Sequence, residues 1–181
     1  MNEAELRNLM YTAQLPEQNL PFSIRYPRGE GVMPHWQTKM EKIAIGKGRK
    51  LKAGTDIAVL SFGHVGNFVT EAMNQLTDIS VAHFDMRFAK PLDTDLLHEV
   101  GQQHQLVITV EDGTIVGGFG SACLEFFAEN NYKPTVERLG IPDRIVEHGK
   151  QQQLYNECHY DTNAIIAKIK EVVIAPALLK Q

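Results

Sequence analysis

The sequence contains few cysteines, and its histidines show no spacing typical of a metal site. Among 181 residues only Cys123 and Cys158 are cysteines, and they do not form a CxxC pair. Few and unpatterned cysteines are typical of reduced thiols in a cytosolic protein. The seven histidines form no HxxxH or HExxH motif, whereas a zinc site needs three or four converging ligands. We therefore expect free thiols, no bound metal and a cytoplasmic location.

Long apolar runs and a strong charge bias are also missing. No apolar run approaches the roughly 18 residues that a membrane span requires, and the N-terminal MNEAELRNLM lacks the apolar core of a signal peptide. The net charge of −4 argues against a nucleic-acid partner bound mainly through phosphate contacts. A GxSxG elbow, which would present a nucleophilic serine, is absent. We therefore expect no membrane or nucleic-acid partner, and structural roles for Ser61 and Ser121.

The most informative stretch covers residues 105–124, QLVITVEDGTIVGGFGSACL. The apolar run at 106–110 predicts a strand that is covered on both faces. Glu111 and Asp112 follow, then a glycine-dotted loop, and then a helix that opens at Gly118. Open α/β sheets bind ligands at the carboxyl ends of their strands. A solvated turn is nevertheless the simpler interpretation of the two carboxylates, and we favour it.

The residues from Gly118 to Cys123 partly match the dinucleotide-binding fingerprint. That fingerprint requires a tight turn between strand and helix, so that pyrophosphate meets the helix N-terminus. Here six residues separate the end of the strand from the first glycine, and Cys123 replaces the third small residue. We favour a role in the turn and in packing. A nucleotide-binding module built on residues 117–121 is therefore the least favoured function.

Strand and helix patterns alternate over most of the chain. Strands are expected at 56–62, 80–86, 106–110 and 135–139, and helices at 64–76, 93–103, from 118, and from an N-cap at Asp161 to about 173. Strands separated by helices of ten to fifteen residues argue for a mostly parallel sheet with helices on both faces. The predicted fold class is α/β, as a three-layer α/β/α arrangement.

The N-terminal residues have a different organisation. A helix is expected at 2–13, with Asn2 as its N-cap and Glu5 completing a capping box. A short strand is expected at 20–26. One helix and one strand cannot bury both their faces. We therefore interpret residues 1–28 as the end of a preceding domain, and this chain as a fragment that lacks the rest of that domain.

The remaining chain divides into a linker and a second domain. Residues 29–42 show no clean period and are interpreted as the linker, with Trp36 packed on one of the two domains. Residues 43–52 alternate briefly around two glycines, which predicts a small hairpin or an edge strand. The second domain is expected to cover residues 43–181.

Two arginines near the end of the first predicted strand are candidate ligand-binding residues. Arg25 and Arg28 are three residues apart and flank Pro27. The planar guanidinium donates two parallel hydrogen bonds to phosphate or carboxylate and never loses its charge. Arg28 lies just past the strand and can reach into a crevice. From chemistry alone, ligand binding and an interdomain salt bridge are equally supported.

Four segments in order extend this interpretation: IRYPRGEG (24–31), FDMRFAKPLD (84–93), VEDGTIVGGFGSA (110–122) and LGIPDRIVEHG (139–149). Together they resemble the C-terminal portion of the 1-deoxy-D-xylulose-5-phosphate synthase family, within the transketolase superfamily. The resemblance covers essentially the whole chain. It implies a transketolase-type C-terminal domain at 43–181 and, at 1–28, the last helix and strand of the pyrimidine-binding domain.

The resemblance also implies a function for the complete protein. It implies a homodimeric, thiamine-diphosphate-dependent and magnesium-dependent transferase of isoprenoid and thiamine biosynthesis, which decarboxylates pyruvate and joins the two-carbon unit to glyceraldehyde 3-phosphate. Arg28 matches the second arginine of the family's RYPRG motif, which helps to bind the substrate phosphate. No role follows for Arg25, and the roles of His64, Glu111 and His148 stay open.

The same resemblance implies that this chain lacks most of the machinery. No GDG…N magnesium-diphosphate motif is present, and the family's cofactor-activating glutamate belongs to the preceding domain. We therefore expect no catalytic, cofactor-binding or metal-binding residue here, and a fragment that is inactive alone. The alternative is a non-catalytic subunit-assembly domain of the 2-oxoacid dehydrogenase β-subunit type.

Overall fold

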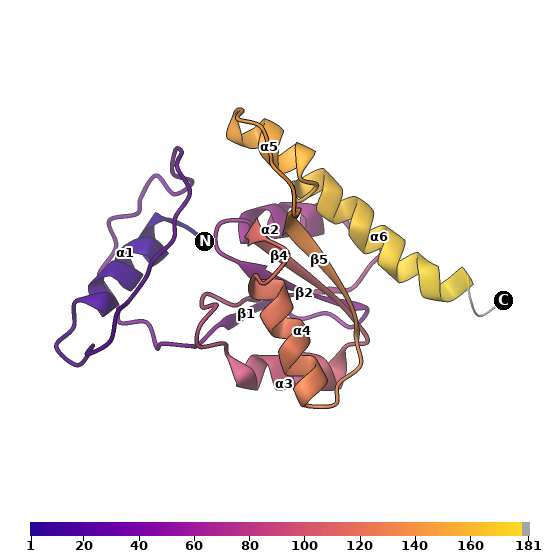
Figure 1. Cartoon of the computed structure of the whole chain (residues 1–181), viewed down its shortest axis with the longest axis horizontal. Helices are drawn as coiled ribbons and strands as arrows, with labels where there is room; N and C mark the ends of the chain where they lie inside the picture. The colour runs from indigo at the N-terminus through magenta and orange to yellow at the C-terminus, as the bar shows by residue number, and fades with distance from the viewer. Residues whose placement is uncertain (179–181) are drawn as a thin grey trace.

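A five-stranded sheet organises the computed structural model, which describes residues 1–178 (Figure 1). Its strands are β1 Arg49–Lys52, β2 Ile57–Phe62, β3 Val81–Asp85, β4 Leu106–Thr114 and β5 Thr135–Ile141. Their order in the sheet is β1-β3-β2-β4-β5. β1 runs antiparallel to β3, and the other neighbouring pairs are parallel. The mostly parallel sheet that strand–helix alternation predicted is thus confirmed.

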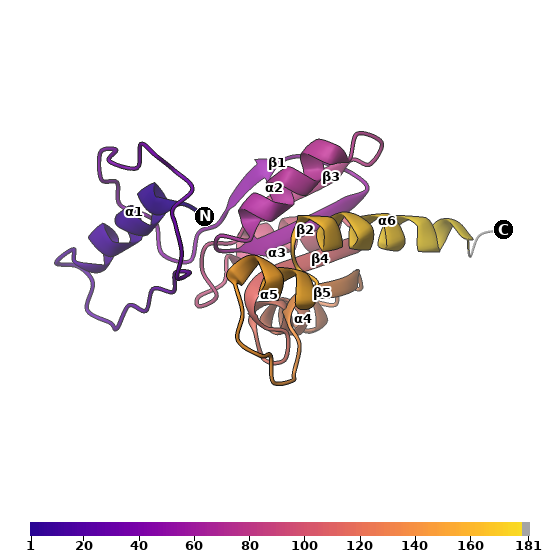
Figure 2. The same ribbon diagram turned by 90° about the horizontal axis from the view of Figure 1, so that it is seen from above.

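Helices cover both faces of this sheet and complete the predicted three layers (Figure 2). One face packs against α2 Gly66–Gln75, α5 Gln151–Glu157 and α6 Thr162–Leu178, and the other against α3 Thr94–Gln103 and α4 Phe119–Glu129. Since both faces are covered, the central apolar side chains of β2 (57–60) and of β4 (107, 108 and 110) are fully buried on both sides of the sheet. No helix within residues 1–178 is both long and apolar enough to cross a membrane.

Two aspartates start helices where the sequence predicted it. Asp93 accepts the Leu96 N–H at the start of α3, and Asp161 accepts the Ala164 N–H across 2.9 Å at the start of α6. The seven-residue α5 was not predicted. Its sequence QQQLYNE contains a single apolar pair and therefore shows no helical period.

The N-terminal segment stands beside the three α/β/α layers, which we call the sandwich (Figure 1). It contains one helix, α1 Glu3–Ala13. Asn2 caps α1 as predicted, because its side chain accepts the Glu5 N–H across 3.0 Å. The expected capping box is wrong in its other half. Glu5 Oε1 accepts a bond from Arg87 instead, and Glu5 Oε2 pairs with Arg49 and the N-terminal amine.

Three further expectations for this region meet different outcomes. The strand expected at 20–26 is not formed, because a strand needs a neighbouring strand for its hydrogen bonds and these residues have none within the described chain. Residues 29–42 contain no helix or strand. Of the possible hairpin at 43–52, only the edge strand β1 is present.

Candidate functional site

The candidate site lies where β2 and β4 end, at the carboxyl edge of the sheet. His64 follows β2, Asp112 lies near the end of β4, and Tyr160 precedes α6. Asp112 Oδ1 accepts the Tyr160 hydroxyl across 2.8 Å, and Asp112 Oδ2 lies 3.8 Å from His64 Nδ1. We call these three residues the carboxyl-edge cluster. Open α/β sheets bind their ligands at this edge.

Burial decides the protonation of two members of the cluster. The His64 ring packs against Phe68 and Tyr155, with centroids 5.9 and 5.6 Å apart. Burial lowers the pKa of His64, although the Asp112 charge opposes the shift, so the imidazole is neutral at pH 7. Burial and the hydrogen bond to Asp112 raise the pKa of Tyr160, which therefore stays a hydroxyl donor.

The structure brings Arg25 to this cluster. Arg25 Nη2 donates to the main-chain oxygen of Asp112 across 3.0 Å, although 87 residues of chain separate the two. Its guanidinium also passes over Gly113, where an added Cβ would stand 3.4 Å from Arg25 Nη1. Arg25 thus binds the backbone of the β4 end, a contact that no sequence pattern indicated.

Arg28, the predicted phosphate ligand, has an exposed side chain and lies three residues after Arg25, which contacts the end of β4. The following residue, Gly29, lies against the tip of the exposed Gln151 side chain at the start of α5, which an added Cβ would displace. The RYPRG segment therefore reaches α5, directly after the LGIPDRIVEHG segment.

Glu111 has a structural role that contradicts the interpretation as a solvated turn. Its side chain is 4% exposed, and its two oxygens accept the N–H groups of Phe119 and Gly120, each across 2.9 Å. A carboxylate at this place satisfies backbone donors at the start of α4. It also occupies the position where a dinucleotide phosphate would bind, which argues against the nucleotide-binding module.

A second charged cluster connects α1 to the β1 edge of the sheet. Glu5 lies 2.7 Å from Arg87 Nε and 3.1 Å from Arg49 Nη2, and Arg49 also pairs with Asp85 at 2.9 Å. Burial alone would raise the pKa of Glu5, but the terminal amine, Arg49 and Arg87 together hold it below its usual value. For Asp85, burial and the nearby Glu5 charge raise the pKa. Sequence patterns did not indicate this cluster.

Ser61 and His83 extend that cluster into the sheet. Ser61 Oγ lies 2.9 Å from His83 Nε2, and both side chains are buried. Burial and the Arg49 charge lower the pKa of His83 to about 4. Ser61 is thus structural, as expected, since it packs inside the sheet rather than facing an open site.

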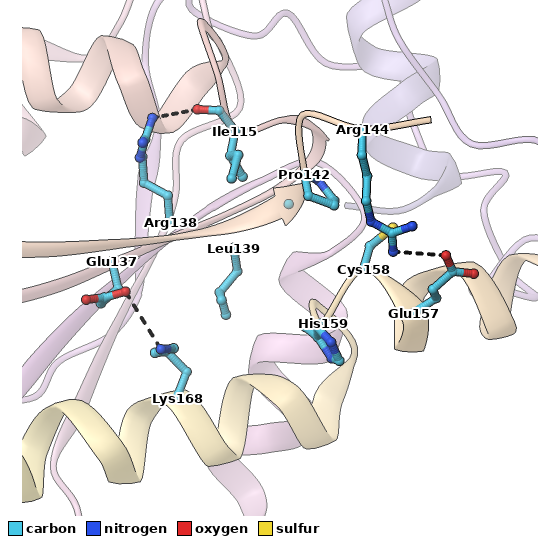
Figure 3. Close-up of a pocket in the computed structure, with 11 residues that line it drawn as sticks. Ile115, Glu137, Arg138, Leu139, Pro142, Arg144, Glu157, Cys158, His159 and Lys168 are labelled. Atoms are coloured by element: carbon cyan, nitrogen blue, oxygen red, sulfur yellow. Dashed lines mark hydrogen bonds and ion pairs between the residues drawn. The ribbon is translucent and has the colours of Figure 1, made fainter. Parts of the chain in front are cut away.

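A pocket of about 350 Å³ opens along β5 (Figure 3). Its charged side chains are already paired with one another: Arg144 with Glu157 at 2.9 Å and Lys168 with Glu137 at 3.7 Å. Arg138 turns toward the Ile115 carbonyl, to which it donates across 2.6 Å. Arg144 and Lys168 are therefore compensated by carboxylates, whereas the Arg138 charge is bonded only to neutral oxygens.

The described residues do not fit a magnesium–diphosphate site. Within residues 1–178, no three His, Cys, Asp or Glu side chains are grouped so as to bind a metal ion. The N-terminus of α4, the obvious backbone site for a phosphate, is filled by Glu111. Cys123 and Cys158 are free and buried, as expected, and burial raises the pKa of both thiols.

Comparison with known proteins gives a consistent match. Residues 46–165 match the family model described as "Transketolase, C-terminal domain". The chain is 59% identical over 174 residues to the 1-deoxy-D-xylulose-5-phosphate synthase of Cytophaga hutchinsonii, covering 95% of this chain and 27% of that protein. The chain is 50% identical over 184 residues to the enzyme of the same name from Bacteroides thetaiotaomicron. This match covers 99% of this chain and 28% of that protein. The chain thus spans about a quarter of the length of these relatives.

Solved structures give the same fold. One is a split-gene transketolase, described as an "inactive beta4 tetramer" (four β chains), which is 26% identical to this chain with a TM-score of 0.67. The match covers 74% of this chain and 44% of that one. The transketolase of Campylobacter jejuni is 15% identical with a TM-score of 0.52, covering 70% of this chain and 18% of that one. At that identity the second match supports the fold alone.

Proposed function

This chain belongs to the transketolase C-terminal domain family, and from that premise we propose that it is the C-terminal part of a 1-deoxy-D-xylulose-5-phosphate synthase. The complete enzyme would condense pyruvate, with decarboxylation, with glyceraldehyde 3-phosphate to give 1-deoxy-D-xylulose 5-phosphate. The relatives of that name, which match 95% and 99% of this chain, support the assignment. It would act in isoprenoid and thiamine biosynthesis, as a cytoplasmic homodimer.

The chain's direct contribution would be Arg28, as a ligand of the substrate phosphate. The observation that supports this role is that Arg28 is exposed and lies three residues after Arg25, which donates to the Asp112 main-chain oxygen at the carboxyl end of β4. A guanidinium can donate two parallel hydrogen bonds to a phosphate and keeps its charge at any physiological pH. Arg28 would bind and orient the aldehyde substrate and would take no part in bond making.

The proposal divides the chain as the sequence suggested: residues 1–28 complete the pyrimidine-binding domain, 29–42 form the linker and 43–181 the C-terminal domain. The apolar stripe of α1 supports this division. Leu6, Leu9 and Ala13 are only half-buried and Met10 is 51% exposed. An amphipathic helix of a folded domain normally buries such a stripe, so this face would pack on the missing part of that domain.

Thiamine diphosphate and Mg²⁺ would be bound by the rest of the complete enzyme. The lack of a suitable group of ligands within residues 1–178 supports this assignment. No step of the carbon–carbon bond formation is therefore given to this chain. Alone, the chain would be inactive.

Steady-state kinetics of the complete enzyme test the role of Arg28. In the Arg28→Ala variant we expect the KM for glyceraldehyde 3-phosphate to rise about 10- to 100-fold, because a charge-assisted contact is worth about 1.5–3 kcal/mol. The KM for pyruvate should change less than about twofold. Lys133→Ala, which removes a cationic side chain from the exposed turn before β5, is the control. Equal losses for both substrates would contradict the phosphate role.

A further inference from the structure

The segment that contains Arg28 contacts the C-terminal domain on both sides of that residue. On the N-terminal side, Arg25 Nη2 donates to the Asp112 main-chain oxygen across 3.0 Å. On the C-terminal side, Gly29 lies against the amide tip of the exposed Gln151 side chain, which an added Cβ would displace. The exposed Arg28 side chain lies between these two contacts. The contacts of its neighbours therefore limit where the Arg28 backbone can lie.

The acceptor of the Arg25 bond is itself fixed in place. Between Val110 and Thr114 the pairing of β4 with β5 shifts register, so β4 contains extra residues here. Such irregularities leave backbone groups outside the sheet ladder, and the Asp112 carbonyl is available to Arg25. The Asp112 carboxylate accepts the hydroxyl of Tyr160, a residue that is 2% exposed. A buried donor thus restricts how this part of β4 can rotate.

From these contacts, and resting on the proposed function, we propose that Arg25 is a positioning residue for Arg28. The hydrogen bonds that link Arg25, Asp112 and Tyr160 set the place of the Arg28 guanidinium, and through it the preference for a phosphorylated aldehyde. Pro27 makes the link stiff, because its ring restricts φ between the two arginines. A binding group displaced by about 1 Å loses much of its effect. Arg25 thus contributes to specificity without touching the substrate.

The test uses the complete enzyme and a pair of aldehydes that differ in the phosphate. The measured quantity is kcat/KM with glyceraldehyde 3-phosphate divided by kcat/KM with D-glyceraldehyde, called the phosphate preference. We expect Arg28→Ala to lower it about 100-fold and Arg25→Ala about 10-fold. In the Arg28→Ala background, Arg25→Ala should lower it no further, because coupled residues are not additive. The KM for pyruvate should stay the same in all three variants.

A second variant and a control complete the design. Tyr160→Phe removes one hydroxyl and keeps the ring in the core, and we expect it to lower the phosphate preference about threefold. Lys133→Ala should leave it unchanged. If Arg28→Ala leaves the preference unchanged, the proposed role of Arg28 fails. If Arg28→Ala lowers it and Arg25→Ala does not, or if Arg25→Ala acts equally in both backgrounds, only the positioning role fails. If the phosphate preference of Tyr160→Phe equals that of the parent enzyme, Tyr160 does not contribute to the positioning of Arg28.

Discussion

Glu5 of α1 and Arg87, which follows β3, form a 2.7 Å ion pair although 82 residues of chain separate them. The Glu5 side chain is 7% exposed and the Arg87 side chain 20%. Arg49 and the N-terminal amine bind the same carboxylate. This shared carboxylate connects the N-terminal segment to the sandwich, on the β1 side of the sheet. The Arg25 contact is the corresponding connection on the β4 side.

Replacing Glu5 should loosen the N-terminal segment. Glu5→Gln leaves two guanidiniums near an uncharged side chain, and we expect a loss of about 2 kcal/mol in the free energy of unfolding. Urea denaturation of the 181-residue chain measures it. Glu17→Gln is the matched control, since its ion pair with Lys42 is about half-exposed on both sides and should contribute far less to stability than the Glu5 pairs. Equal losses in the two variants would contradict a special role for Glu5.

The same carboxylate should make stability depend on acid pH. The pKa of Glu5 is lowered in the folded chain, so its contribution is complete above the unfolded pKa and is lost as the pH falls through the folded pKa. Between Glu5→Gln and the parent chain, the difference in unfolding free energy should therefore shrink below about pH 4.5. A difference that stays constant down to pH 3 would contradict this prediction.

Removing the Glu111 carboxylate should destabilise the start of α4. Glu111→Ala leaves the N–H groups of Phe119 and Gly120 buried without an acceptor, which should cost about 3 kcal/mol. Chemical denaturation measures the loss. Glu125→Ala, on an exposed face of the same helix, is the control and should change stability by less than about 0.5 kcal/mol. A similar small change for Glu111→Ala would show that water replaces the carboxylate.

His83 should make the chain less stable in mild acid. Its pKa is lowered from 6.5 to about 4 in the folded chain, so the neutral form is favoured by folding. The contribution of His83 to the free energy of unfolding is therefore complete above about pH 6.5. As the pH falls from about 6.5 to about 4, the free energy of unfolding should fall by about 3 kcal/mol in total. Unfolding free energies measured across that range should fall more steeply for the parent chain than for His83→Gln. An NMR titration of His83 with a midpoint near 6.5 would contradict the assignment.

The 181-residue chain should not bind thiamine diphosphate tightly. No suitable group of ligands is present within residues 1–178, so titration calorimetry with the cofactor and Mg²⁺ should show no micromolar binding. The complete enzyme serves as the positive control. A micromolar Kd for the chain alone would overturn the assignment of the cofactor site to the rest of the enzyme.

The sequence alone determined the layered architecture of residues 49–178. Apolar strands at 57–62 and 106–110, separated by helices with one apolar face, left a mostly parallel sheet as the consistent arrangement. The start of α6 was also predictable, because Asp161 caps it through a local bond. Such features depend on residues that are near in sequence, which explains why the pattern was sufficient.

Only the tertiary structure decided the roles of Glu111, Glu5 and Arg25. Each of these charged side chains stands in a segment whose local pattern allows a solvated position. Their partners lie eight, 82 and 87 residues away in the chain. The strand expected at 20–26 failed for the same reason, since a strand exists only where a neighbouring strand supplies its hydrogen bonds. Local patterns therefore specified most helices and strands of the layered domain, whereas contacts between distant residues decided what its charged groups do.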